Sequence, residues 1–130
     1  MIVNASNLFE ILKQHNKPFV CFLQGDLGAG KTTFVRQYMQ HLGYQGLVKS
    51  PSYTLVELYE SEKIAHLDLY RINFVDKNLL QELALTEYLG DFSIFIEWPE
   101  RLAPGLIEPD FKITITIDPE TNDRLFNFQP

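Results

Sequence analysis

A glycine-rich segment in the first third of the chain has residues that could hold phosphate groups. Gly25, four further residues and then Gly30, Lys31 and Thr32 match the Walker A pattern. We expect positive φ at the glycines, so that successive N–H groups can approach phosphate oxygens without a Cβ in the way. Lys31 is placed to reach the β- and γ-phosphates, and the Thr32 hydroxyl to ligate Mg²⁺. The expected ATP-binding residues of this segment are Gly25, Asp26, Leu27, Gly28, Ala29, Gly30, Lys31, Thr32 and Thr33.

Two carboxylates are candidates to act on the same nucleotide. Glu97 directly follows the apolar run 92–96, so it can project from a strand end toward the phosphates and bind Mg²⁺, although a solvated strand-end glutamate is the alternative. Asp68 lies between Leu67 and Leu69 and would point away from the core that they face. It could orient the attacking water or bind the metal through water. A surface salt bridge with Arg71 explains Asp68 equally well.

The remaining polar and aromatic candidates give weaker signals. No Cys or second His stands at metal-ligand spacing from His66, so a packed or hydrogen-bonded histidine is favoured over a zinc ligand. Trp98 follows Glu97 and could lie beside the nucleotide, but core packing also explains it. Arg71, Arg101 and Arg124 could each neutralise transition-state charge, and each could equally be a paired surface residue.

The elements around the Walker A segment are those that the motif requires. Residues 19–23 form an unbroken apolar run typical of a central strand covered on both faces. From Lys31 the apolar positions follow a helical period, and Gly43 is placed to end that helix. Strand, glycine loop and helix in this order make a chance match of the motif improbable. A helix within residues 4–16, with Ser6 or Asn7 as N-cap, is expected to precede them.

The rest of the pattern predicts a mixed sheet. Residues 54–59 and 64–69 read as a hairpin joined across 60–63, and residues 79–89 as a helix ended by Gly90. Residues 92–96 are a second buried strand, and 111–117 alternate as a half-exposed strand does, with 125–128 as its expected partner. We therefore predict a three-layer α/β, P-loop NTPase-like fold with a mixed sheet flanked by helices. The strand order stays open.

Length and composition bound the function. A chain of 130 residues is sized for a single domain, residues 1–130. Cys21 is the only cysteine, so no intramolecular disulfide is possible and a reducing, cytoplasmic location is expected. Its place in an apolar run favours a core residue over a nucleophile. None of the apolar runs is long enough to span a membrane. The net charge is −6 with scattered basic residues, which argues against direct binding of nucleic acid.

Four separated segments, taken together, are more specific than the glycine loop alone. They run from Gly25 to Phe34, from Ser50 to Leu55, from His66 to Arg71 and from Glu97 to Glu100. Together they resemble one family, the bacterial tRNA threonylcarbamoyladenosine biosynthesis ATPases known as TsaE or YjeE. The likeness covers about residues 5 to 118. One departure is Ser52 and Tyr53, where the family usually has Thr and Phe, but serine keeps a hydroxyl.

The resemblance implies a weak Mg²⁺-dependent ATPase that joins two proteins, TsaB and TsaD, and supports their multiple turnover on tRNA held by those partners. By similarity Lys31 and Thr32 bind phosphate and Mg²⁺, Glu97 is the second metal-site residue and Asp68 is the acid needed for hydrolysis. The expected catalytic residues are therefore Lys31, Asp68 and Glu97, and Trp98 beside Glu97 completes the expected nucleotide-binding residues. The loop 50–54 looks like a switch that senses the γ-phosphate, and the Ser52 hydroxyl in it could contact the metal. The implied metal residues are therefore Thr32, Glu97 and Ser52.

Three other functions remain open from the sequence. A small-molecule kinase would use the same loop, but such enzymes usually need a lid with several arginines. Residues 68–91 are the longest stretch available for a lid, and their single arginine is Arg71. A GTP switch lacks an Asn-Lys-x-Asp element in this chain. A binding module with a degenerate site would not be expected to keep Lys31, Thr32 and Glu97 together.

Overall fold

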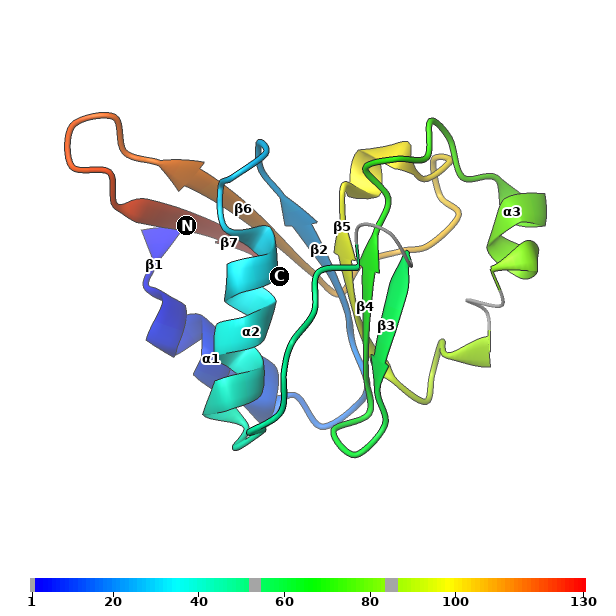
Figure 1. The fold of residues 1–130 in the computed structure, drawn as a ribbon, viewed down its shortest axis with the longest axis horizontal. Coiled ribbons are helices and arrows are strands. Elements are labelled where there is room, and N and C mark those ends of the chain that lie inside the picture. The colour runs from blue at the N-terminus through cyan, green and yellow to red at the C-terminus, as the bar shows by residue number, and fades with distance from the viewer. Residues whose placement is uncertain (1, 52–54, 84–86) are drawn as a thin grey trace.

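The structure is a computed structural model, and it describes residues 2–51, 55–83 and 87–130. The described residues form a seven-stranded mixed sheet in the order β1-β7-β6-β2-β5-β4-β3 (Figure 1). The four central strands β6, β2, β5 and β4 are parallel, while β3, β7 and β1 are antiparallel to their neighbours. The strands are β1 (Ile2–Val3), β2 (Val20–Gln24), β3 (Val56–Tyr59), β4 (Ile64–Asp68), β5 (Ser93–Glu97), β6 (Phe111–Ile117) and β7 (Arg124–Gln129).

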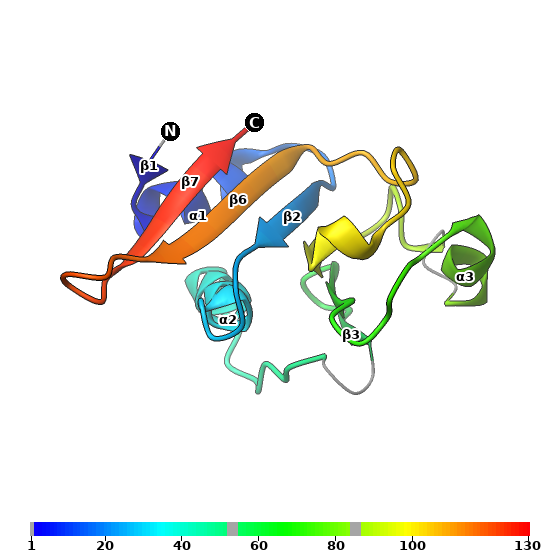
Figure 2. The ribbon, with the colours of Figure 1, turned by 90° about the horizontal axis from the view of Figure 1, so that it is seen from above.

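Helices cover the sheet on both faces. Helices α1 (Ala5–Gln14) and α2 (Lys31–His41) pack on one face, with Leu8 and Phe34 in the core between helices and strands (Figure 2). On the other face, Leu80 of α3 (Lys77–Glu82) packs with the second apolar cluster, beside the short 3-10 helix η2 (Pro99–Arg101). The predicted three-layer α/β fold is therefore confirmed.

Strand β2 lies at the centre of the sheet, as its unbroken apolar run predicts. It pairs in parallel with β5 on one side and β6 on the other. Cys21 is fully buried in β2, and burial raises the pKa of its thiol, so it is a core residue. The predicted hairpins are also present as β3 with β4 and β6 with β7.

Several predicted boundaries are wrong. The N-cap of α1 is Asn4 and not Ser6 or Asn7: its Oδ1 accepts a hydrogen bond from the Asn7 N–H over 2.9 Å. The helix expected at 79–89 begins at Lys77, because Asp76 caps it, and ends at Glu82; Leu89 instead forms a β-bridge with Phe92.

The end of α2 follows its prediction. Gly43 has φ +92° and donates its N–H to the Gln40 carbonyl, while Tyr44 donates to Met39. These two bonds are those of a Schellman motif, in which glycine supplies the left-handed residue. Helix α2 is thereby held at both ends, by this motif and by the glycine loop before it.

Candidate functional site

The glycine loop between β2 and α2 has the backbone conformation that an anion site needs. Gly28 has φ +81° and Gly30, the N-cap of α2, has φ +108°. Gly30 has no side chain to accept hydrogen bonds from the first amides of the helix. These N–H groups and the positive end of the helix dipole can therefore face a phosphate.

Gly25 is required for a different reason from the one expected. It is not among the positive-φ glycines, so that expectation is wrong for this residue. A Cβ atom at Gly25 would instead lie 2.7 Å from the carbonyl oxygen of Ile115 in β6 and 3.1 Å from the Ala29 Cβ. The glycine lets the loop begin tightly against the neighbouring strand.

Lys31 is held inside this loop. Its side chain is buried, and its Nζ donates to the carbonyl oxygens of Gly25 and, over 3.3 Å, Asp26. The ammonium also lies 4.0 Å from the centre of the Trp98 ring. Burial lowers the pKa of Lys31, and Glu97 and Asp68 oppose that shift. The lysine is thus a poorly hydrated cation beside two carboxylates.

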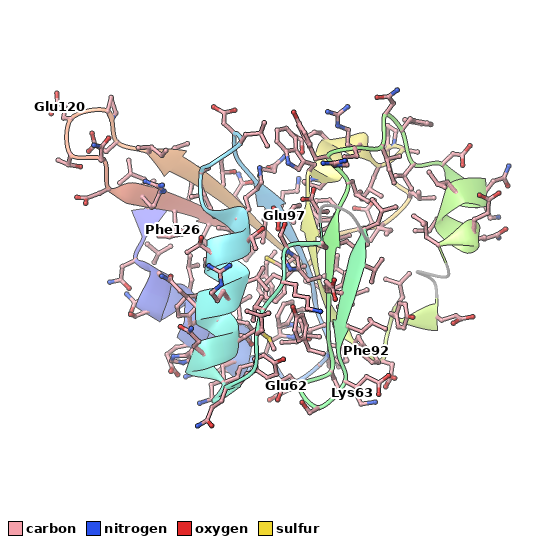
Figure 3. All side chains as sticks on the ribbon, viewed as in Figure 1. Glu62, Lys63, Phe92, Glu97, Glu120 and Phe126 are labelled. Carbon is pink, nitrogen blue, oxygen red and sulfur yellow. The ribbon has the colours of Figure 1, made fainter. Side chains whose placement is uncertain are left out.

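Glu97 ends β5 next to the start of α2 (Figure 3). Its Oε2 accepts a hydrogen bond from the Thr32 hydroxyl over 2.8 Å and lies 2.5 Å from Nε2 of His66. Glu97 is 3% exposed and His66 is fully buried, so the carboxylate is not a solvated strand-end residue. His66 is a hydrogen-bonded histidine, the alternative that its isolation from other metal ligands favours.

Asp68 lies opposite Glu97 in the register of β4 and β5, on the sheet face that carries α2. Leu67 and Leu69 pack in the cluster on the other face, as the alternation predicts. Asp68 is 6% exposed, and its Oδ1 accepts a hydrogen bond from the Tyr70 N–H over 3.0 Å. The two candidate carboxylates therefore share one site.

These groups line one cavity of about 270 Å³ at the N-terminal end of α2. Gly25 and Asp26 lie instead beside a second cavity, between the glycine loop and residues 114–117 of β6. The residues that line the first cavity are Leu27, Gly28, Ala29, Gly30, Lys31, Thr32, Thr33, Ser50, Asp68, Tyr70, Glu97, Trp98 and Arg124.

The remaining candidate residues differ in where they lie relative to the first cavity. Ser52, expected to contribute to the metal site, lies outside the described residues, whereas Ser50 lines the cavity. Arg101 lies with its guanidinium 5.9 Å from the Trp98 ring, and neither it nor Arg71 is among the residues that line the cavity. Trp98 is half-buried with φ +59° and packs against Tyr70, so it belongs to the cavity wall.

Sequence reasoning missed two relationships. The spacing of two places His66 and Asp68 on one face of a strand, but the contact of His66 with Glu97 also requires β4 to pair with β5, which no local pattern indicates. The contact of Arg124 with the glycine loop had no local signal, because it joins residues more than ninety positions apart.

The model of the family described as "Threonylcarbamoyl adenosine biosynthesis protein TsaE" matches residues 3–126. The chain belongs to the TsaE family. The chain is similar to the TsaE protein of Haemophilus influenzae, with 44% identity over 112 residues that cover 83% of this chain and 68% of the relative. The TsaE protein of Rickettsia prowazekii is 37% identical over 117 residues, covering 84% and 80%.

The fold of this TsaE family member is similar to the crystal structure of Bacillus subtilis YdiB. The TM-score is 0.66 at 27% identity, and the match covers 98% of this chain and 86% of the other. The family resemblance and the P-loop NTPase-like fold expected from the sequence are both confirmed. Across residues 2–51, 55–83 and 87–130, none of the helices combines the length and apolarity needed to cross a membrane.

Proposed function

We propose that this chain is a slow, Mg²⁺-dependent ATPase of the cytoplasmic machinery that makes threonylcarbamoyladenosine in tRNA, acting with TsaB and TsaD. The observation that carries the proposal is the convergence of Lys31, Thr32, Asp68 and Glu97 on one cavity at the start of α2. Membership of the TsaE family supports the biosynthetic role, because the family and the two relatives carry that biosynthesis in their names.

The glycine loop and Lys31 bind the phosphates. The amides that begin α2 offer hydrogen bonds to the phosphate oxygens, and the helix dipole adds attraction for negative charge. Lys31 now bonds to two loop carbonyls, and a triphosphate gives its ammonium a stronger, charged partner. Lys31 therefore moves a short distance from loop carbonyls to phosphate oxygens.

The oxygen donors near the loop fit a magnesium ion. Mg²⁺ prefers oxygen ligands and is usually held by one or two protein groups together with substrate phosphates and water. The Thr32 hydroxyl and the Glu97 carboxylate lie within hydrogen-bond distance of each other and would hold it. When bound, the ion supplies positive charge that offsets the charge developing on the phosphates.

Asp68 is the group suited to act on water. Its position opposite Glu97 puts it in the cavity wall, and the Tyr70 N–H fixes one of its oxygens. As a water oxygen attacks the γ-phosphorus, the bond to the β–γ bridging oxygen breaks and ADP leaves. Asp68 orients the water and takes up its proton, which yields ADP and inorganic phosphate.

The partners hold the tRNA. The net charge of −6 and the scattered basic residues argue against phosphate-backbone binding by this chain itself, so we expect it to act on tRNA indirectly. ATP hydrolysis then serves the turnover of the partner complex, while the threonylcarbamoyl group comes from another reactant.

Release of inorganic phosphate from ATP tests the enzyme activity. The wild-type chain with Mg²⁺ should release phosphate slowly without any metabolite acceptor, and Lys31→Ala or chelation of Mg²⁺ should reduce release to background. Lys112→Ala is the matched control, because Lys112 is exposed on β6 and does not line the cavity. Equal release of phosphate by the wild type and by Lys31→Ala would contradict the proposed ATPase activity.

Reconstituted modification of tRNA tests the biological role. TsaB, TsaD and an unmodified tRNA are supplied with an activated threonylcarbamoyl donor, with and without this chain, at tRNA in large excess over enzyme. We expect the chain to raise the number of turnovers and Lys31→Ala to fail to do so. Identical yields with and without the wild-type chain would refute the role.

A further inference from the structure

The C-terminal hairpin reaches back to the glycine loop through one side chain. Arg124, the first residue of β7, donates from Nε to the carbonyl oxygen of Ala29 over 2.8 Å. Its Nη2 donates to the Gly28 carbonyl oxygen over 3.3 Å, and its Nη1 donates to the carbonyl oxygen of Asn122 in its own hairpin over 3.2 Å. One guanidinium thus joins the loop to β7. In the sheet, β7 lies two positions away from β2, with β6 between them (Figure 1).

The two carbonyls that Arg124 binds lie between the two left-handed glycines of the loop. Gly28 and Gly30 can each adopt many backbone conformations, so the loop has to be restrained if its amides are to face the phosphates. A guanidinium has several N–H donors in a rigid plane and can hold two carbonyl oxygens at once. Holding both carbonyls on the hairpin side leaves the neighbouring amides to face the cavity.

Arg124 also contributes charge. Among the described residues that line the cavity, Lys31 and Arg124 are the two cations, and they oppose the carboxylates of Asp68 and Glu97. Lys31 is 5% exposed, whereas Arg124 is exposed at the rim. Because surface charge is screened by water and salt, the charge of Arg124 alone has a small effect. Its hydrogen bonds to the loop are the larger contribution.

We propose that Arg124 is a positioning residue that holds the glycine loop in its phosphate-binding conformation before the nucleotide arrives. This inference rests on the proposed function, because it assumes that the loop binds a nucleoside triphosphate. Without Arg124 the loop occupies the binding conformation for a smaller fraction of the time. The apparent affinity for ATP then falls by that fraction, while the bound state is unchanged.

Three variants separate positioning from charge. Arg124→Ala removes both the hydrogen bonds to the loop and the positive charge. Arg124→Lys keeps the charge but lacks the planar guanidinium that holds two carbonyl oxygens. Arg36→Ala is the control, because Arg36 is on the exposed side of α2, away from the cavity. Titration with ATP and Mg²⁺ should show about tenfold weaker binding for Arg124→Ala, the size expected for lost charge-assisted hydrogen bonds. Arg124→Lys should bind about as weakly, and Arg36→Ala should match the wild type.

Kinetics give the second measurement. Since the nucleotide restores the bound conformation, both Arg124 variants should show a raised KM for ATP with kcat within about twofold of wild type. Without nucleotide, both Arg124 variants should still melt in one cooperative transition, within a few degrees of the wild-type melting temperature, which excludes loss of fold. Wild-type affinity in Arg124→Ala would overturn the inference, and so would wild-type affinity in Arg124→Lys, because charge would then suffice.

The same titration distinguishes the two proposals. If the wild type binds ATP and the Arg124 variants bind it equally well, only the role of Arg124 fails. If the wild type itself binds no ATP, the proposed function fails and this inference fails with it.

Discussion

The hydroxyl of Thr32 donates a hydrogen bond to Oε2 of Glu97 over 2.8 Å, although the two residues are 65 positions apart in the chain. Thr32 lies in the first turn of α2 and Glu97 ends β5, so the contact forms only because β5 pairs directly with β2. The sheet order therefore brings the two expected metal-binding oxygens together.

Replacing each of the two carboxylates by the amide of the same size should have different effects. Glu97→Gln should raise the Mg²⁺ concentration needed for half-maximal ATP hydrolysis by about tenfold or more, because it weakens an ionised oxygen ligand. Asp68→Asn should keep Mg²⁺-ATP binding and lower kcat by about 100-fold, the contribution of a general base. Magnesium titrations of hydrolysis measure both. A normal Mg²⁺ requirement in Glu97→Gln would contradict this division.

His66 should act through Glu97. Loss of the buried contact in His66→Leu leaves Oε2 with one fewer partner, and we expect about tenfold higher Mg²⁺ to be needed for hydrolysis. His66→Gln can place an amide nitrogen where Nε2 lies and should recover part of the loss. Denaturant melts of both variants control for folding. An unchanged Mg²⁺ requirement in a folded His66→Leu would show that the contact has no functional role.

Two glycines of the loop should differ in how alanine affects stability. Gly25→Ala drives a Cβ into the Ile115 carbonyl and should cost about 1–3 kcal/mol of unfolding free energy, as overpacking does. In Gly28→Ala the new Cβ has no atom within 4 Å, so the cost is only that of placing alanine at a φ of +81°. We expect this change to lower the unfolding free energy by about 1 kcal/mol. Urea denaturation compares the two. Equal stability of Gly25→Ala and wild type would rule out the close approach.

Lys31 should give a pH-dependent stability difference. Burial lowers its folded-state pKa below the ordinary value of about 10.4, so the unfolded chain binds more protons in the window just below that value. The charged lysine therefore disfavours folding at neutral pH, and this cost is relieved as pH rises through that window. The unfolding free energy of wild type minus that of Lys31→Met should increase from pH 7 toward pH 10. A decrease would contradict the direction of the shift.

The parts of the site that follow one another in the chain could be predicted from sequence. Residues 20–41 form strand, glycine loop and helix because the pattern is local: an apolar run, flexible glycines and helical spacing. The position of Glu97 follows in the same way from the apolar run before it. The β6–β7 hairpin could be predicted because apolar and polar residues alternate strictly along its first strand.

Relationships across the sheet could not be predicted in the same way. The pairing of Asp68 with Glu97 requires β5 to lie between β2 and β4, an order that depends on crossover connections and not on local pattern. The two residues of β1 are too few to show a period. The end of α3 at Glu82 was missed because apolar residues continue at a helical spacing beyond it.

Binding of ATP with Mg²⁺ to the wild type and to Lys31→Ala, followed by isothermal titration calorimetry, tests the central claim most directly. We predict one saturable site per wild-type chain and the loss of that binding in Lys31→Ala, with Lys112→Ala binding as wild type does. An unchanged affinity in Lys31→Ala, or no binding by the wild type, would contradict a phosphate site in the loop from Gly25 to Thr32.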